Sequence, residues 1–221
     1  MITVHHLEDS RSQRVLWLLE ELGQDYAVKR YDRDKSTKLA PPGLKAVHPL
    51  GKSPVIEDDG RVVAETGPIV EYLIDKYGGG KFRPQKGTDD YLKYVYWMHF
   101  AEGSAMTQLI LKMFFTEIKN AKVPFFVKPI AKAIAGRVLG TYVDPNIRDQ
   151  LDFIETELQG QEWFAGPEIS GADIMMVFPL EAVQKLTSLT TRHNCSAYIR
   201  RIHQRSAYRR ALEKGGPYAY S

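Results

Sequence analysis

Over roughly the first 80 residues, the spacing of apolar positions switches repeatedly between a strand-like period and a helical one. Residues 2–7 and 26–30 form short apolar-rich runs that predict strands. The segment between them, residues 12–23, predicts a helix because its apolar positions share one face and Gly23 is a typical helix stop. The chain therefore opens with a predicted strand–helix–strand unit.

A hairpin and a second helix are predicted next. Apolar runs at residues 54–57 and 61–64 flank Asp58-Asp59-Gly60, and Asp-Gly between apolar runs is a strong hairpin signal. Residues 66–77 then predict a helix with Thr66 as its cap. The combined order, β-α-β and then β-β-α, describes a small mixed sheet covered by helices.

Beyond residues 81–87, which contain proline and glycine and predict a linker, the spacing of apolar positions is helical. Asp144-Pro145 predicts the start of a helix, since proline favours the first helical position. Ser170 and Asp173 match the pattern of a capping box at the start of a largely buried helix.

Two domains are therefore expected. Residues 1–80 predict an α/β unit and residues 88–221 predict an all-helical unit, so the fold class is α/β plus all-α. The second unit carries an excess of basic residues near its end. We interpret that excess as solvated helix faces, with a patch for nucleic acid or an anionic membrane as the alternative.

Composition narrows the class of protein further. With 30 basic and 27 acidic residues, the net charge of +3 is too balanced for a protein whose main partner is a nucleic acid. No segment approaches ~20 consecutive apolar residues, so we expect no membrane span. The single cysteine, Cys195, allows no intrachain disulfide, and the histidines lack ligand spacing, so no metal site is predicted. These features fit a reducing compartment, and we expect a cytoplasmic location.

The start of the helix at residues 66–77 is a candidate binding site. The unpaired N–H groups and partial positive charge of a helix N-terminus bind a carboxylate well. Thr66 offers its N–H and hydroxyl to such a carboxylate, and Glu65 offers a negative charge to an ammonium group. Together they complement the zwitterionic end of an amino acid. The alternative is an ordinary threonine cap beside an exposed glutamate.

A second candidate is Ser53-Pro54, because an X–Pro bond is the common site of a cis peptide. A cis bond at this strand start would turn the backbone of Ser53 outward, where it can pair with an extended peptide ligand. Lys52 beside it can meet a second carboxylate. The alternatives are a trans proline on an edge strand and a solvated lysine.

A third candidate, Ser10, lies in the turn just before the first helix. A hydroxyl there can donate a hydrogen bond to a thiolate and lower the pKa of the thiol, helped by the helix dipole. The alternative is a turn or N-cap serine.

Four segments together resemble the cytosolic glutathione transferase family, and the likeness covers nearly the whole chain. They are residues 10–22, 48–55, 64–73 and 170–174. Each motif alone is weak, but four in the right order and at the right distances are specific. The His-Pro-Leu-Gly-Lys-Ser-Pro form at residues 48–54 is closest to a subgroup seen in fungi and bacteria.

The resemblance implies a thioredoxin-like N-terminal domain that binds glutathione as co-substrate. Glu65 and Thr66 would hold its γ-glutamyl end. Ser53, before a cis Pro54, would pair with the cysteinyl backbone, and Lys52 would meet the glycine carboxylate.

The resemblance also implies a hydrophobic pocket for a second substrate in the helical domain. The candidates share one helix face and include adaptable methionines. They are Met106, Ile110, Met113 and Phe114. Core packing is the rival interpretation of these four side chains.

The family divides by whether Tyr, Ser or Cys approaches the glutathione sulfur, and Ser10 falls at the position of the Ser-type members. The resemblance therefore implies a homodimeric detoxification transferase in which Ser10 is catalytic and the thiolate attacks a hydrophobic electrophile. One alternative is a glutathione-dependent peroxidase acting on a hydroperoxide. The other is a non-catalytic scaffold, against which the retained ligand-binding residues argue.

Overall fold

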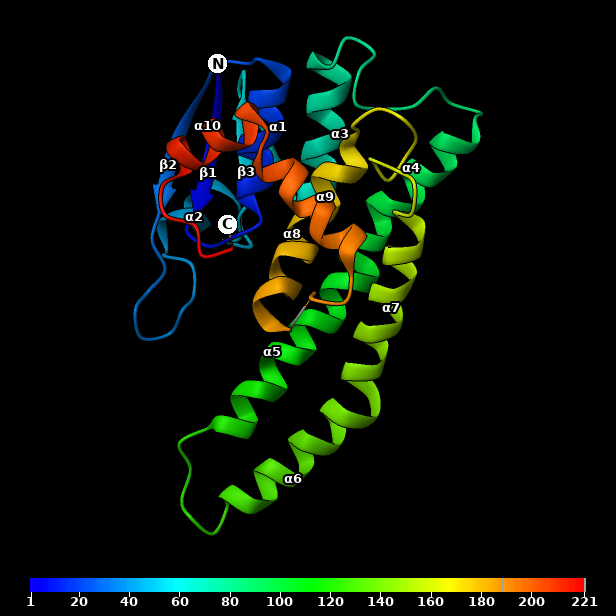
Figure 1. Cartoon of the computed structure of the whole chain (residues 1–221). Coiled ribbons are helices and arrows are strands. Elements are labelled where there is room, and N and C mark those ends of the chain that lie inside the picture. Colours follow the sequence, from blue (N-terminus) through cyan, green and yellow to red (C-terminus); the bar gives the residue numbers. More distant parts are fainter. Residues whose placement is uncertain (188, 221) are drawn as a thin grey trace.

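The structure, a computed structural model, describes residues 1–187 and 189–220. A small sheet with its helices forms the N-terminal part, and a larger group of helices forms the rest (Figure 1). The predicted fold class, an α/β unit followed by an all-α unit, is confirmed.

The sheet has four strands in the spatial order β2-β1-β3-β4. The strands are β1 (Ile2–Leu7), β2 (Tyr26–Tyr31), β3 (Val55–Asp58) and β4 (Arg61–Ala64). β1 and β2 run parallel, which requires a crossover connection, and helix α1 (Ser12–Leu22) supplies it. β3 is antiparallel to both of its neighbours, as the predicted hairpin requires.

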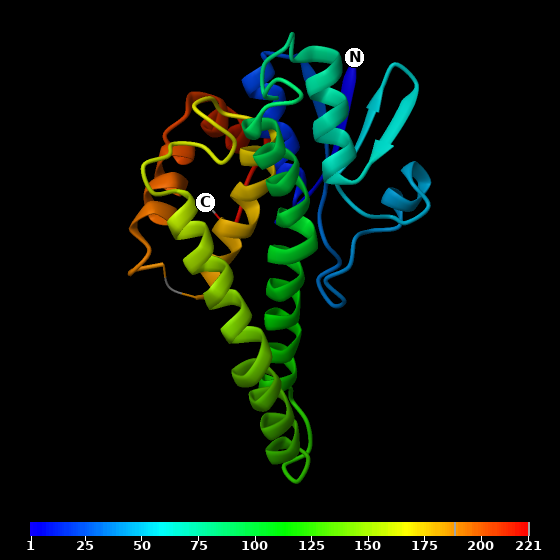
Figure 2. The same ribbon diagram turned by 90° about the vertical axis from the view of Figure 1, so that its right-hand side faces the viewer.

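The helical part is built on a long hairpin beside a buried central helix. The first limb is α4 (Asp89–Phe100), η1 (Ala101–Ala105) and α5 (Met106–Asn120), and the second is α6 (Lys128–Val138), η2 (Leu139–Val143) and α7 (Asp144–Glu157). The central helix is α8 (Gly171–Leu186), followed by α9 (His193–His203) and α10 (Ser206–Gly215). Figures 1 and 2 both show α5 and α6 projecting well beyond the rest of the molecule. Within residues 1–187 and 189–220, no helix is long and apolar enough to span a bilayer.

Helix α1 is the point at which the two parts meet. It packs on β1 and α3 (Thr66–Tyr77) of the N-terminal part and on α8 and α10 of the helical part. Residues 12–20 of α1 are consequently all buried, although the sequence pattern predicts one apolar face. The short helix α2 (Gly43–Val47) is not predicted by the sequence pattern.

The α-helix α7 begins at Asp144 with Pro145 in its first turn, as predicted, but the prediction that Asp144 caps a separate new helix is wrong. The π-helical turn η2 joins α6 to α7 without a break, so Pro145 lies inside a continuous helical limb. A π turn shifts the hydrogen-bond register by one residue, which accommodates a residue that has no N–H to donate.

The predicted capping box at the start of α8 is confirmed. The backbone N–H of Ser170 donates to Oδ2 of Asp173 (2.8 Å), and the Ser170 hydroxyl accepts from the N–H of Ala172 (3.3 Å). Asp173 also accepts from the N–H of Phe164 (3.0 Å), so the box ties the loop before α8 to the helix start.

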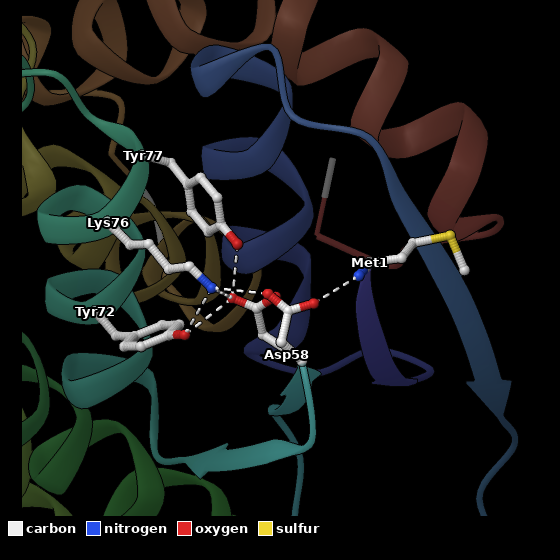
Figure 3. Close-up of polar contacts among 6 residues, drawn as sticks. Met1, Asp58, Tyr72, Lys76 and Tyr77 are labelled. Atoms are coloured by element: carbon white, nitrogen blue, oxygen red, sulfur yellow. Dashed lines mark hydrogen bonds and ion pairs between the residues drawn. The ribbon is translucent and has the colours of Figure 1, made fainter.

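A buried carboxylate ties α3 to the sheet (Figure 3). Asp58, at the end of β3, accepts hydrogen bonds from Tyr72 (2.9 Å), Lys76 (2.7 Å) and Tyr77 (2.7 Å). Burial alone would raise the pKa of Asp58, but these donors outweigh it and lower the pKa to about 2. The cluster fixes α3 against β3 and so sets where the start of α3 points.

Replacing Asp58 by asparagine should lower the free energy of unfolding by about 2 kcal/mol near neutral pH. A depressed carboxyl pKa stabilises the fold at every pH above its unfolded value of 3.8, and that contribution is lost as the pH falls to about 2. Urea unfolding at several pH values measures both effects. The matched control is Asp59→Asn, because Asp59 is exposed. Equal losses of stability in the two variants would contradict the prediction.

Candidate functional site

One cavity brings together most of the residues that the sequence singles out. It has a volume of about 260 Å³ and lies where the α/β part meets η1 and α5. Its lining side chains are those of Arg11, His48, Leu50, Lys52, Ser53, Pro54, Ala64, Glu65, Thr66, Glu102 and Ile110. All five residues predicted to bind glutathione are among them.

The loop before β3 forms one wall of the cavity. The Ser53–Pro54 peptide bond is cis, as the family resemblance implies. The Ser53 hydroxyl donates to the carbonyl of His5 (2.8 Å) and accepts from the N–H of Leu7 (3.3 Å). Pairing between β1 and β3 begins at His5 and Val55, so Ser53 precedes the ladder. The side chain of Ser53 is thus anchored to β1, and Lys52 is exposed at the rim.

The start of α3 forms the opposite wall. Glu65 is the N-cap residue and has a positive φ of 71°, while Thr66 is the first helical residue. The prediction of Thr66 as the cap is therefore wrong. Its hydroxyl instead accepts a hydrogen bond from Arg14 (3.2 Å). The N–H of Thr66 still belongs to the first helical turn, where N–H groups lack partners inside the helix and favour an anion.

Ser10 is buried in the turn between β1 and α1, one residue before the cavity-lining Arg11. Its hydroxyl donates to the carbonyl of Leu7 (2.7 Å) and lies 2.7 Å from the Ser12 hydroxyl. The Ser12 hydroxyl is in turn 2.8 Å from Nδ1 of His6. Burial, aided by a nearby arginine, lowers the pKa of His6 to about 4, so this ring is neutral at neutral pH. Ser10 therefore ends a buried hydrogen-bonded chain of neutral groups.

A charged network that the sequence pattern did not predict lies behind the cavity. The fully buried guanidinium of Arg14 donates to the carbonyl of Met175 (2.6 Å), to Thr66 and to Oε1 of Glu102 (2.5 Å). Arg11 approaches the other Glu102 oxygen, with Nε to Oε2 at 3.1 Å. One signal was present in the sequence: Arg14 precedes Leu18 at the spacing of one helical turn and so shares the apolar stripe. Glu102 gave no comparable signal.

Glu102 brings a negative charge to the cavity wall. Burial would raise the pKa of Glu102, but the charges of Arg14 and Arg11 and their hydrogen bonds outweigh it and lower the pKa below its ordinary value. The carboxylate is therefore ionised at neutral pH, next to Glu65 on the same cavity. Two carboxylates and a helix N-terminus together suit a ligand group that carries both an ammonium and a carboxylate.

The four predicted second-substrate residues lie in different environments. Ile110 lines the cavity, and Met113 and Phe114 are exposed further along α5. Met106 is buried and belongs to the core of the helical part. The apolar side of a ligand site at this cavity is thus centred on Ile110.

A larger hollow of about 750 Å³ adjoins this site between α3 and α4. It shares Glu65, Thr66 and Glu102 with the first cavity, and its further lining includes aromatic residues of α4. Those three residues therefore line both hollows.

The remaining reactive group that the sequence offers, the thiol of Cys195, has a structural role. Cys195 is buried in α9, and burial together with Glu155 raises the pKa of its thiol far above the usual range, so it stays a protonated thiol. Among the residues that the structure describes, no three metal-ligating side chains of the His, Cys, Asp or Glu type cluster together. A reactive sulfur at the cavity would have to arrive with a ligand.

Comparison with known proteins gives matches in both parts of the chain. The family model "Glutathione S-transferase, N-terminal domain" matches residues 10–76, and "Glutathione S-transferase, C-terminal domain" matches residues 113–205. Glutathione S-transferase 3 of Schizosaccharomyces pombe is 36% identical over 97% of this chain and 88% of its own length.

Solved structures show the same similarity. A glutathione S-transferase of Actinobacillus pleuropneumoniae is 33% identical, with a TM-score of 0.77 over 100% of this chain and 95% of that one. A glutathione transferase of Phanerochaete chrysosporium, solved with oxidized glutathione, shares the fold at 21% identity, with a TM-score of 0.76 over 97% and 94% of the two chains.

Proposed function

Since this chain belongs to the glutathione S-transferase family and is a glutathione transferase, we propose that the cavity of about 260 Å³ is its glutathione site and that Ser10 activates the thiol. The observation that carries this proposal is that one cavity brings together the loop before β3 and the start of α3, and that four of the five residues each match a different group of one small peptide.

The proposed contacts follow the charges of the ligand. The γ-glutamyl carboxylate meets the N–H of Thr66 at the start of α3, and its ammonium meets Glu65. The cysteinyl backbone pairs with the backbone of Ser53 beside Pro54, as an added strand would. The glycine carboxylate meets Lys52, which is exposed at the rim.

The proposed reaction uses the bound thiolate as the nucleophile. A hydrogen bond from Ser10 favours the thiolate over the thiol and lowers the thiol pKa. The sulfur then attacks the electrophilic carbon of a hydrophobic second substrate held near Ile110, Met113 and Phe114. A carbon–sulfur bond forms and the leaving group departs with its electron pair. Holding the thiolate and the electrophile together in the reactive geometry supplies the other large part of the rate acceleration.

Replacing Glu65 by glutamine should weaken glutathione binding by about tenfold, because the ligand ammonium loses its charge partner. Lys52→Met should weaken it by a smaller factor, since Lys52 is exposed and its interaction is screened by solvent. Titration calorimetry measures both affinities. Glu213→Gln, an exposed glutamate on α10, is the control. A wild-type protein without saturable glutathione binding would overturn the proposed site.

A parallel assay with an aryl halide and an organic hydroperoxide separates the two enzymatic alternatives. A transferase conjugates the aryl halide, whereas a peroxidase consumes the hydroperoxide and produces oxidised glutathione. We expect conjugation, because Ile110 and the exposed apolar residues of α5 beside the site suit a hydrophobic electrophile.

We also propose a homodimer that forms through α4. Leu92 and Tyr96 are large apolar side chains on α4, yet both are exposed, and the hollow between α3 and α4 lies on the same helix. A second copy of the chain on this face would bury them. Light scattering should give twice the mass of the chain, and Tyr96→Glu should shift the mass toward that of a monomer. A monomeric wild-type protein would contradict the dimer.

A cytoplasmic detoxification role completes the proposal. The buried thiol of Cys195 and the absence of any disulfide partner for it in this sequence suit a reducing compartment. Cell fractionation checks the location, and the sensitivity of a deletion strain to electrophiles checks the role.

A further inference from the structure

The part of the helical hairpin that projects from the molecule carries features that the proposed site does not use. We call residues 113–137 the arm; it comprises the end of α5, the connecting loop and most of α6. In both ribbon views its tip is the point furthest from the sheet (Figures 1 and 2). A flat surface can therefore reach the tip without meeting the rest of the molecule.

Two phenylalanines stand side by side at this tip. Phe125 is 86% exposed and Phe126 is 66% exposed, and their rings pack edge to face with centroids 5.6 Å apart. Three isoleucines of the arm, Ile118 on α5 and Ile130 and Ile134 on α6, are exposed as well. Large exposed apolar side chains that gather on one segment are typical of an interaction site.

The arm is also strongly basic. It contains one acidic residue, Glu117, and five exposed basic residues, Lys119, Lys122, Lys128, Lys132 and Arg137. Its net charge of +4 exceeds the +3 of the whole chain, so the remainder of the protein is slightly acidic. By contrast, Lys112 at the base of the arm is neutralised by Asp144 (2.6 Å). The positive charge is thus concentrated around the apolar tip.

We propose that the arm docks on an anionic lipid surface, with Phe125 and Phe126 inserted at the level of the headgroups and the surrounding lysines facing lipid phosphates and carboxylates. The apolar tip matches the interfacial layer of such a surface, because aromatic side chains partition into that layer. The surrounding cations match the anionic headgroups, because each cation gains attraction from them. The docking residues are those of the tip, which excludes Met113 and Phe114 near the proposed second-substrate site, and the docking does not depend on the proposed glutathione site.

The charge and the apolar tip of the arm favour a lipid surface over two other possible binding partners. A symmetric contact with the arm of a second copy would bring a charge of +4 against +4, which opposes association. A nucleic acid would match the charge, but it offers no apolar layer for the adjacent phenylalanines at the tip. A lipid surface satisfies the charge and the apolar side chains together.

Co-sedimentation with vesicles tests the proposal. The full-length protein should bind phosphatidylcholine vesicles that contain phosphatidylserine at least tenfold more tightly than vesicles of phosphatidylcholine alone, and added salt should weaken that binding. The double variant Phe125→Ser/Phe126→Ser should lose at least tenfold in affinity, as should Lys122→Glu/Lys128→Glu.

Matched controls come from the exposed loop after β2. Leu39→Ser and Lys35→Glu make the same kinds of change at exposed positions outside the arm, and both should bind vesicles as the wild type does. Turnover of a water-soluble substrate should be equal in the arm variants, which shows that they are folded. Equal binding to both vesicle types would overturn the proposal, and so would wild-type vesicle binding by the phenylalanine variant. A mass that falls in the arm variants without loss of vesicle binding would assign the tip to a second copy instead.

Discussion

Replacing Ser10 by alanine should lower turnover by roughly one to two orders of magnitude, with little change in glutathione affinity. The Ser10 hydroxyl has one proton, which it gives to the carbonyl of Leu7 (2.7 Å). Rotation about the Cβ–Oγ bond can redirect that proton to a thiolate while Oγ keeps the hydrogen bond that it accepts from the N–H of Ser12 (3.3 Å). Without this donor, the pKa of bound glutathione should rise by about one unit. The ultraviolet absorbance of the thiolate, followed against pH, measures it.

The neighbouring Arg11 is the other group that can activate the thiol, so the test compares variants of both residues. Arg11 lines the cavity and carries a positive charge, which can also favour a thiolate. If the hydroxyl is the activating group, Ser10→Ala raises the thiol pKa and Arg11→Gln changes it less. Unchanged turnover in Ser10→Ala, with a raised thiol pKa in Arg11→Gln, would transfer the role to Arg11. Because Ser10 also holds its turn through Leu7, thermal unfolding of each variant must accompany the kinetics.

Replacing Arg14 by methionine should lower the free energy of unfolding by about 3 kcal/mol, the lower end of the range for breaking a buried ion pair. The side chain of Arg14 is only 1% exposed, and its guanidinium links Thr66 on α3, Glu102 on η1 and the carbonyl of Met175 on α8. Its removal leaves a half-buried carboxylate with one partner and a buried carbonyl without its donor. Denaturant unfolding measures the loss of stability.

Arg11→Met is the matched control, because it also replaces by methionine an arginine that contacts Glu102. Arg11 is 31% exposed and lies 3.1 Å from Glu102, so its loss should cost less than about 1 kcal/mol. Arg14→Met should also weaken glutathione binding, since it releases the hydroxyl of Thr66 and the carboxylate of Glu102 at the cavity wall. Equal destabilisation by the two variants would show that burial of Arg14 is not the source of the effect.

Local sequence patterns were sufficient to predict the strands and helices that position the cavity-lining residues. The hairpin around Gly60, the stop of α1 at Gly23 and the capping box at Ser170 each depend on residues within a few positions of one another. The five residues proposed to bind glutathione were singled out by their residue types together with the family motifs that contain them. They sit at a strand start and at a helix start, where backbone groups lack local partners whatever the rest of the chain does.

Two local predictions failed where a distant group or a change of helical register intervened. Thr66 has the chemistry of a cap, but Glu65 occupies that position and Arg14, more than 50 residues earlier, takes the Thr66 hydroxyl. Pro145 has the chemistry of a helix start, but the preceding π turn carries the helix through it. In each case the residue type was compatible with two structures, and packing selected one.

The sequence by itself determined the fold class and the elements of the sheet, because their signals lie within short stretches of chain, and its family motifs singled out five residues that line the cavity of about 260 Å³. Only the tertiary structure decided which charges face that cavity. The contact of Arg14 with Glu102 spans 88 residues, and the contact of Arg14 with Met175 spans 161 residues. No periodicity records such distances, since they arise only when α1, η1 and α8 pack together and a buried guanidinium must find partners among the groups that packing brings to it.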